Sequence, residues 1–307
     1  MTYPIIKVPE GASSQLEQLG TKSKFWYRNE HGKRVMFKRG RPGTGENWAE
    51  KVCCEVCRLL EIPHAEYDFA TANVGRWKGV ASPTFVLEGS RLILGNELLA
   101  GIEPEYEKTK RYRTRQHTLR RVYAVLTKLQ IALPLDYRPP ETGEITKALH
   151  VFTGYLLLDA LVSNQDRHHE NWGLISMPDT SLSLAPTFDH ASSLGRNETD
   201  ERRLGRLGTR DRGYSVQSYV SRAESALYPG TASRKPYTTM QAFENAARLN
   251  LSAARYWGAK LSLCSCKDFE EIFDNVPESE ITGPARRFAL EMLEVNAERL
   301  INLEVLK

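Results

Sequence analysis

The densest group of polar side chains in the 307-residue sequence lies in one segment, Asn164 to Asn171. This segment contains Asp166, and a further acid, Asp189, follows eighteen residues after Asn171. Transfer of a phosphoryl group from a nucleotide needs a carboxylate that orients the attacking hydroxyl, and oxygen ligands that hold Mg²⁺ against the phosphates. Asp166, Asn171 and Asp189 offer these groups in that order, and protein kinases use the same five-residue interval between Asp and Asn. The pattern indicates ATP- and Mg²⁺-dependent phosphoryl transfer.

The neighbouring elements place these residues in loops. Apolar residues recur at helical spacing over 144–163, directly before the polar segment. Strand-like runs at 172–176 and 182–185, joined by the turn Pro178 to Ser181, predict a hairpin between the polar segment and Asp189. Trp172, in the first of these strands, is expected to pack in the core.

Lys38 ends a second predicted hairpin, formed by the runs 24–28 and 34–38. A kinase needs a strand lysine that neutralises the nucleotide phosphates and a helix acid that holds this lysine in place. The next predicted helix, over 46–60, is expected to be capped by Thr44. Glu50 on this helix is the expected partner of Lys38, and Glu46 is the weaker alternative.

The two motifs Asn-x-Asp-Arg-His-x-x-Asn, from Asn164 to Asn171, and Leu-Ala-Pro-x-Phe-Asp, ending at Asp189, occur in this order. Together they resemble the HipA-like serine/threonine kinases of bacterial toxin–antitoxin systems, which share Asp-Arg-His-x-x-Asn with phosphoinositide kinases. The Asp-Arg-His order reverses the His-Arg-Asp of ordinary eukaryotic protein kinases. His190 and Ala191 replace the Phe-Gly that follows the metal-binding Asp in those enzymes.

The resemblance implies a role for each matching residue. Asp166 would be the general base, Asn171 and Asp189 would bind Mg²⁺, and Lys38 would contact the phosphates of ATP with Glu50 as its partner. His168 and Phe188 would line the nucleotide site, and Gly95 to Leu98, with Glu97, would form the hinge that reads adenine. Arg167 and His169 are expected to stabilise the loop by hydrogen bonds.

Upstream of the first strand, a short polar segment resembles the phosphate-covering loop of these kinases. Its candidate ATP-binding residues are Gly20, Thr21, Lys22, Ser23 and Lys24. Ser23 has two interpretations, an autophosphorylation site, as in HipA-like kinases, or a hydrogen bond within a turn.

The expected fold is α+β and bilobal, like that of protein kinases. Residues 1–98 would form a small, β-rich N-lobe, with further strand-like runs at 66–71, 84–87 and 91–94. Residues 99–307 would form a larger, mostly helical C-lobe, with predicted helices over 114–130 and 284–303 besides 144–163.

Several functions fit this pattern. The leading hypothesis is a kinase that phosphorylates serine or threonine of a protein, with an aminoacyl-tRNA synthetase as the substrate class that the resemblance suggests. The chain resembles the short HipA members, and an antitoxin partner is an open expectation. The alternatives are a phosphoinositide or small-molecule kinase and a non-catalytic binding protein with a kinase scaffold. No helix-turn-helix pattern is visible, so direct DNA binding is not expected.

Composition sets the remaining limits. The net charge is only +4, but the run from Lys108 to Arg121 holds seven Lys and Arg residues and no acid. This run fits either a solvated surface or a docking surface for an anionic partner, such as an RNA-associated protein or RNA. A second basic run spans Arg202 to Arg212.

No apolar stretch is long enough to span a membrane and no secretory signal is visible, so a cytoplasmic protein is expected. The five cysteines favour buried or half-buried free thiols over a zinc site or disulfides. His64, after Pro63, is expected at a surface turn.

Overall fold

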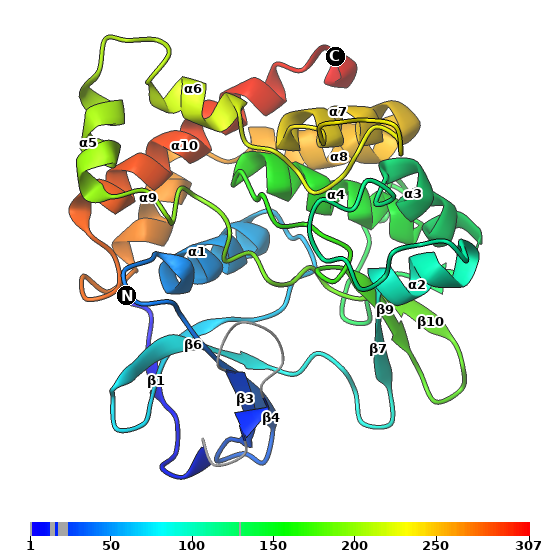
Figure 1. Cartoon of the computed structure of the whole chain (residues 1–307), viewed down its shortest axis with the longest axis horizontal. Coiled ribbons are helices and arrows are strands. Elements are labelled where there is room, and N and C mark those ends of the chain that lie inside the picture. Colours follow the sequence, from blue (N-terminus) through cyan, green and yellow to red (C-terminus); the bar gives the residue numbers. More distant parts are fainter. Residues whose placement is uncertain (1, 13–15, 18–23, 129) are drawn as a thin grey trace.

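The computed structural model describes residues 2–12, 16–17, 24–128 and 130–307. Its chain forms two lobes, a strand-rich one at the N-terminal end and a larger helical one after it (Figure 1). This arrangement agrees with the predicted α+β, bilobal architecture. The expected lobe boundary at Leu98 falls inside helix α2 (Gly95–Ile102).

A six-stranded sheet forms most of the N-lobe, in the order β1-β5-β6-β4-β3-β2. β3 and β4 are the predicted hairpin, and they set Lys24 opposite Lys38. Phe25, Phe37 and their alternate neighbours face a small apolar core. The strands are β1 (Ile5–Lys7), β2 (Leu16–Glu17), β3 (Lys24–Arg28), β4 (Arg34–Arg39), β5 (Asp68–Ala72) and β6 (Trp77–Pro83).

The prediction of a strand at 84–87 is wrong, because β6 ends at Pro83 and the Thr84 hydroxyl accepts a hydrogen bond from the Val86 N–H in a local turn. β6 itself was not predicted. Its Gly79 lies so close to β4 that an added Cβ would stand 2.3 Å from the Lys38 carbonyl oxygen. Only glycine allows this approach of the two strands.

Helix α1 (Glu46–Leu59) follows the hairpin as predicted, but Thr44 does not cap it. Gly45 occupies the N-cap position, and its N–H donates to the Arg196 carbonyl, 3.0 Å away. The Thr44 hydroxyl instead donates to the Arg41 carbonyl. The helix start is therefore fixed by a distant segment of the C-lobe rather than by a local cap.

The C-lobe contains a second, four-stranded sheet and most of the helices. The sheet order is β7-β9-β10-β8, and β9 with β10 is the predicted hairpin. Its strands are β7 (Arg91–Leu94), β8 (Ile131–Ala132), β9 (Gly173–Ser176) and β10 (Leu182–Leu184). The helices after α2 are α3 (Leu119–Lys128), α4 (Ala148–Leu161), α5 (Asp200–Gly208), α6 (Val216–Ser221), α7 (Thr239–Leu249), α8 (Leu251–Ser262), α9 (Cys266–Asp274) and α10 (Gly283–Ile301).

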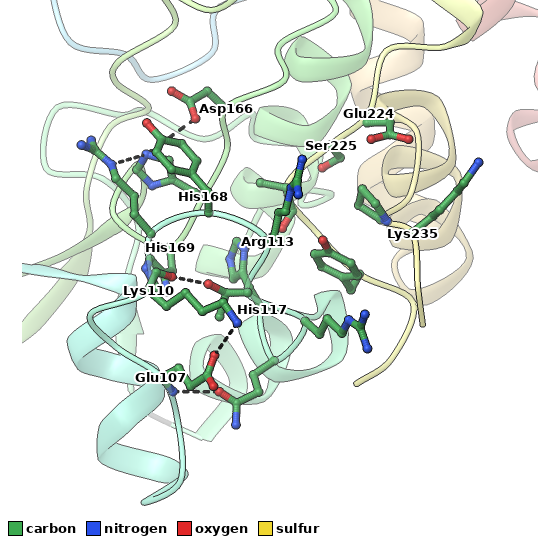
Figure 2. Close-up of a pocket in the computed structure, with 18 of the residues that line it drawn as sticks. Glu107, Lys110, Arg113, His117, Asp166, His168, His169, Glu224, Ser225 and Lys235 are labelled. Atoms are coloured by element: carbon green, nitrogen blue, oxygen red, sulfur yellow. Dashed lines mark hydrogen bonds and ion pairs between the residues drawn. The ribbon is translucent and has the colours of Figure 1, made fainter. Parts of the chain in front are cut away.

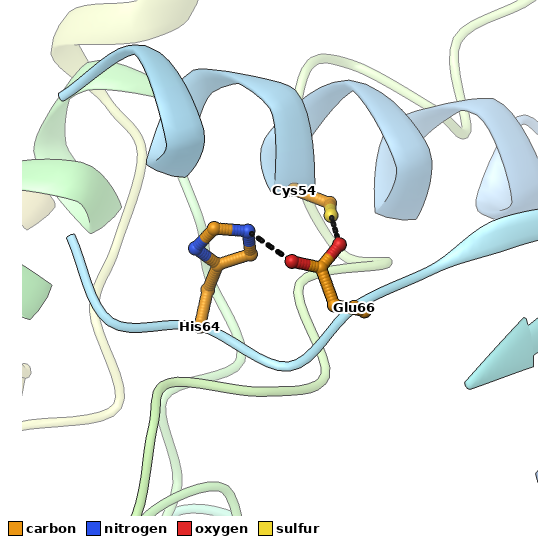
Figure 3. Close-up of side chains that lie close together, drawn as sticks. All are labelled: Cys54, His64 and Glu66. Carbon is orange, nitrogen blue, oxygen red and sulfur yellow. Dashed lines mark hydrogen bonds and ion pairs between the residues drawn. The ribbon is translucent and has the colours of Figure 1, made fainter. Parts of the chain in front are cut away.

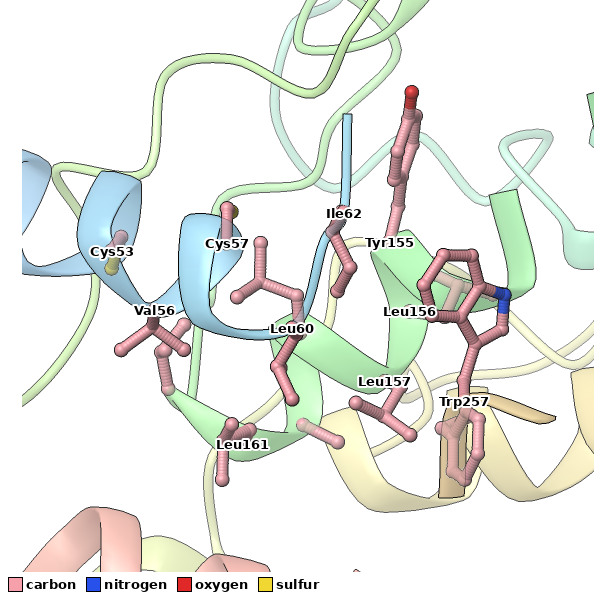
Figure 4. Packing of buried hydrophobic residues seen from close by; sticks show 14 of the residues in the cluster. Cys53, Val56, Cys57, Leu60, Ile62, Tyr155, Leu156, Leu157, Leu161 and Trp257 are labelled. Atoms are coloured by element: carbon pink, nitrogen blue, oxygen red, sulfur yellow. The ribbon is translucent and has the colours of Figure 1, made fainter. Parts of the chain in front are cut away.

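One apolar cluster joins the lobes. It runs from Val56 of α1 and Leu60, directly after that helix, to Leu157 and Leu161 of the central helix α4, and on to Trp257 of α8 (Figure 4). Helix α4 is buried on nearly every side, so its position relative to α1 is fixed by close packing. Because α4 ends directly before the polar segment, the core sets where that segment lies.

Candidate active site

A cavity of about 510 Å³ lies where the two lobes meet, and the predicted site residues gather around it. Lys38, Asp166, Asn171, Phe188 and Asp189 all line it. Its lining also carries an excess of positive charge, with seven Lys and Arg side chains against three carboxylates. A cavity of this size and charge suits a polyanionic ligand that also needs an apolar wall.

Lys38 is the centre of the charged network in this cavity. Its Nζ lies 2.7 Å from Glu50 Oε2 and 2.6 Å from Asp189 Oδ1, and its side chain is only 9% exposed. Burial alone would lower the pKa of Lys38, but the carboxylates of Asp189 and Glu50 raise it well above its ordinary value. Lys38 is therefore a fixed cation, and Glu50 is its helix partner as predicted.

Glu46, the weaker alternative partner of Lys38, lies elsewhere. It forms an ion pair with Arg196 and accepts a hydrogen bond from the Arg41 N–H. Glu46 is in the first turn of α1, one turn before Glu50, so its partners Arg196 and Arg41 lie near the start of the helix. Arg196 lies just past the Asp189 loop and lines the cavity.

Glu50 also joins the Lys38 strand to the Asp189 loop. Its second oxygen, Oε1, accepts a hydrogen bond from the His190 N–H at 2.5 Å. Asp189 itself has a left-handed backbone, with φ of 59°, and its N–H donates to the Tyr67 hydroxyl. Such a conformation is costly for a residue other than glycine and is concentrated at functional sites, where neighbouring contacts hold it.

A buried ion pair with helix α4 holds the polar segment Asn164 to Asn171 in place. Arg167 binds both carboxylate oxygens of Asp159, at 2.7 and 2.8 Å, and both side chains are almost fully buried. Arg167 also donates to the Asn171 carbonyl, so the prediction that it stabilises the loop is confirmed. Asp159 was not among the predicted residues, although a lone acid within the apolar helix α4 indicates a buried partner for it.

Asp166 and Asn171 are tied together within this loop. The Asn171 amide nitrogen donates to the Asp166 carbonyl at 2.7 Å, which orients the amide. The Ser192 hydroxyl donates to Asp166 Oδ2 from the far side of the site. The carboxylate of Asp166 is partly exposed, as a group that must meet an acceptor would be.

His168 lies near Asp166 but does not line the interlobe cavity. Its Nε2 lies 3.0 Å from Arg111 Nε and 3.7 Å from Asp166 Oδ1. Burial, with the nearby charge of Arg111, lowers the pKa of His168 to about 3. The ring is therefore neutral at pH 7. The neighbouring His169 hydrogen-bonds the Tyr106 hydroxyl, and Trp172 is buried in the core, both as expected.

The oxygen atoms at the site fit the donor set that Mg²⁺ prefers. Asp189 offers a carboxylate, and the orientation of Asn171 leaves its amide oxygen as the atom that can face a cation. The cationic Lys38 and Lys24 stand beside these groups on paired strands. Burial and the charges of Lys38 and Arg111 lower the pKa of Lys24, an environment that a phosphate would relieve.

Not every predicted residue reaches the cavity. Phe188 does, stacked on Phe85 with ring centroids 5.6 Å apart. Glu97 does not, because Gly95 begins helix α2 and Glu97 is exposed, paired with Arg91. The expected loop residues Gly20, Thr21, Lys22 and Ser23 lie outside the described residues.

Three side chains that could hold a metal lie together elsewhere, at the back of α1. Cys54 Sγ is 3.7 Å from Glu66 Oε2, and His64 Nε2 is 3.6 Å from Glu66 Oε1 (Figure 3). His64 is largely buried here, which corrects the expectation of a surface turn. Arg58 already binds Glu66 Oε2, so a cation in the cluster would face a fixed positive charge.

The cysteines and the second basic run follow the packing of their helices. Cys53, Cys54 and Cys57 are buried free thiols, but Cys266 is exposed, contrary to the prediction. Arg203, in the second basic run, is buried and paired with Asp200 rather than solvated. Among the described residues, every helix is too short or too polar to span a bilayer.

The fold has counterparts among proteins of known structure. No protein-family model and no curated protein matches the sequence. In structure, the chain is similar to a Helicobacter pylori proinflammatory kinase, CtkA, with a TM-score of 0.70 and 19% identity over 97% of this chain and 96% of that one. It is also similar to HipA from a Shewanella oneidensis MR-1 toxin–antitoxin complex with HipB and operator DNA, with a TM-score of 0.58 and 12% identity over 94% and 68% of the two chains. These matches confirm the bilobal kinase-like fold.

Proposed function

We propose that this chain is a HipA-like kinase that transfers the γ-phosphoryl group of ATP to a serine or threonine of a protein. The observation that carries the proposal is the pair of contacts made by the buried Lys38, 2.7 Å from Glu50 and 2.6 Å from Asp189. This arrangement joins a strand lysine, a helix acid and a metal-ligand acid beside the Asp166 loop. The kinase mechanism requires these groups together.

Each residue has a part in the transfer. Asp166 orients the acceptor hydroxyl and takes its proton as the hydroxyl oxygen bonds to the γ-phosphorus and the bond to ADP breaks. Lys38, held by Glu50, neutralises phosphate charge, with Lys24 on the adjacent strand. Asn171 and Asp189 would hold Mg²⁺, which screens the phosphate charge when it is bound. Met36 and Phe188 offer the apolar wall of the cavity to the base.

The acceptor and the partner are finer parts of the same proposal. The HipA match comes from a toxin–antitoxin system, and the CtkA match is described as a proinflammatory kinase. The HipA likeness supports an antitoxin partner and an aminoacyl-tRNA synthetase as the first acceptor to test. It also supports Ser23 as a site of autophosphorylation, and the cytoplasm as the compartment.

The experiment is an incubation of the purified chain with radiolabelled ATP, with and without Mg²⁺, beside an Asp166→Asn variant. We expect label on serine or threonine only when the wild-type chain and Mg²⁺ are both present. Mass spectrometry would show whether Ser23 carries the label. Bacterial lysate and an aminoacyl-tRNA synthetase are then offered as acceptors. Label on a lipid or small molecule would favour the alternative kinase classes. If no acceptor is labelled and the chain does not bind ATP, the result would favour the non-catalytic binding protein.

A further inference from the structure

A second cavity, of about 1,060 Å³, opens beside the first and meets it at Asp166. Arg111, Tyr112 and Asp166 line both cavities. The second one, called here the basic groove, is formed by residues 107–117, 165–169 and 224–236 (Figure 2). The first cavity, lined by Lys38 and Asp189, is called here the nucleotide cavity. Because the basic groove meets it at Asp166, the groove lies on the side from which an acceptor hydroxyl would approach this carboxylate.

The floor of the basic groove is rigid, although its two walls come from distant parts of the chain. His117 Nε2 accepts a hydrogen bond from Trp172 Nε1, and its Nδ1 lies 3.1 Å from the Ala226 carbonyl. The Tyr228 N–H donates to the His117 carbonyl at 2.9 Å. The wall that carries Arg113 is thus fixed against the wall that carries Lys235.

The charges of the basic groove are mostly available to a ligand. Six Lys and Arg side chains line it, with three carboxylates. Two of the six are paired, Lys110 with Glu107 and Arg111 with Glu170. The other four are exposed and make no ion pair or side-chain hydrogen bond within the described ranges; they are Arg113, Arg115, Arg234 and Lys235.

We infer that the basic groove binds an acidic stretch of the acceptor protein, next to the serine or threonine that Asp166 faces. The inference rests on the proposed function and names the substrate class of the same site. Four unpaired cations on fixed walls attract carboxylates and disfavour a basic segment. This assigns Arg113 and Arg115, from the basic run Lys108 to Arg121, to a docking surface rather than to a merely solvated one.

The groove favours a peptide over single-stranded RNA. Proteins that bind single strands without sequence preference stack successive bases on exposed aromatic faces. Tyr112 is exposed and lies edge-on to His168 with ring centroids 5.6 Å apart, but Tyr228 is buried, so a single tyrosine is open to a ligand. The basic groove thus offers charge without a row of stacking platforms, and its inner end offers a carboxylate, Asp166, to a hydroxyl.

The test is binding of labelled peptides, measured by fluorescence anisotropy, to the wild-type chain and to an Arg113→Asn/Lys235→Gln variant. The peptides share one serine flanked by glutamate, glutamine or lysine. We expect the glutamate peptide to bind best and to lose about tenfold in affinity in the variant. Asparagine at 113 tolerates the left-handed backbone there, where φ is 55°. Arg115→Gln/Arg234→Gln is a second, independent pair that should act in the same direction.

An Arg210→Asn/Arg212→Gln variant is the matched control, because it removes two exposed arginines outside the basic groove, with the same change in net charge. It should bind the glutamate peptide like the wild type. Equal binding of the glutamate and glutamine peptides would overturn the inference. Tighter binding of an oligouridine that is lost in the same groove variant would overturn it in favour of RNA.

The same peptides separate this inference from the proposed function. Phosphorylation of all three peptides at equal efficiency would support the kinase activity and contradict the proposed role of the basic groove. Charge-selective peptide binding with no phosphoryl transfer to any acceptor would support the role of the basic groove and contradict the proposed kinase activity. Charge-selective binding and charge-selective phosphorylation that fall together in the groove variant would support both.

Discussion

The two cavities that meet at Asp166 hold their charges in different ways. In the nucleotide cavity, Lys38 is 9% exposed and pairs with two carboxylates. In the basic groove, Arg113 and Lys235 are exposed and, within the described residues, unpaired. Buried pairs fix geometry, because loss of one partner leaves an uncompensated charge, whereas exposed charges act at a distance and weaken with salt. We propose that the paired charges of the first cavity hold a ligand in a fixed position and that the exposed charges of the basic groove select ligands by their charge.

The largest effect is expected at the residue that both cavities share. Asp166→Asn should lower kcat by about 10²–10⁴-fold, because the acceptor hydroxyl loses its base. The affinity for Mg²⁺ and ATP should stay close to that of the wild type, since Lys38 and Asp189 are unchanged. Initial rates together with calorimetric ATP binding check this. If Asp166→Asn keeps more than a tenth of the wild-type kcat, Asp166 is not the general base.

The next effect concerns the buried pair below the loop. Asp159→Ala should lower the free energy of unfolding by about 3–5 kcal/mol, because Arg167 would keep a buried charge without its partner. Arg113→Asn, in the exposed groove, is the contrasting variant and should change that free energy by less than about 0.5 kcal/mol. Urea unfolding measures both. Similar losses in the two variants would contradict the distinction between buried and exposed charge.

A pH effect should come from His117, below the basic groove. Burial, with the charge of His169 as a smaller cause, lowers the pKa of His117 to about 3. The unfolded chain binds this proton first, near pH 6.5, so stability is lost as the pH falls from about 6.5 toward 3. Between pH 7.5 and 5 the loss is about 2 kcal/mol for this one residue. His117→Gln should flatten the pH dependence by that amount in urea unfolding, and an unchanged slope would refute the burial argument.

The smallest effect should come from the rim of the basic groove. Glu107 pairs with Lys110 at 3.0 Å, and both side chains are about half exposed. Glu107→Gln should release Lys110 and tighten binding of the glutamate peptide about twofold, with little change in stability. ATP affinity should not change, because neither residue lines the nucleotide cavity. Weaker peptide binding in this variant would count against charge as the basis of selection.

Much of the nucleotide side could be predicted from local patterns. Both hairpins and helix α1 follow from strand alternation and helical spacing, and the β3–β4 hairpin with α1 brings Lys38 to Glu50. The interval from Asp166 to Asn171 is short enough for one loop to hold both. These features depend on neighbours in the sequence, which is why the pattern was sufficient.

The errors arise where distant segments decide the local structure. The start of α1 is fixed by Arg196 rather than by Thr44, and helix α3 begins at Leu119 rather than at 114 because residues 114–118 form a turn and a bridge to Tyr228. Gly95 begins helix α2, so the segment from Gly95 to Leu98 is helical rather than an open connection between the lobes. The basic groove joins residues that no local pattern connects, so the sequence could indicate its charge but not its shape.

We propose that the paired charges of the nucleotide cavity hold Mg²⁺ and ATP in position for transfer. The most direct measurement is calorimetric titration of the chain with ATP, with Mg²⁺ or with EDTA, beside an Asp189→Ala variant. We predict that Mg²⁺ tightens ATP binding of the wild type by about tenfold or more, and that Asp189→Ala removes this gain. ATP affinity that is the same with Mg²⁺ and EDTA, or absent in both, would contradict the account.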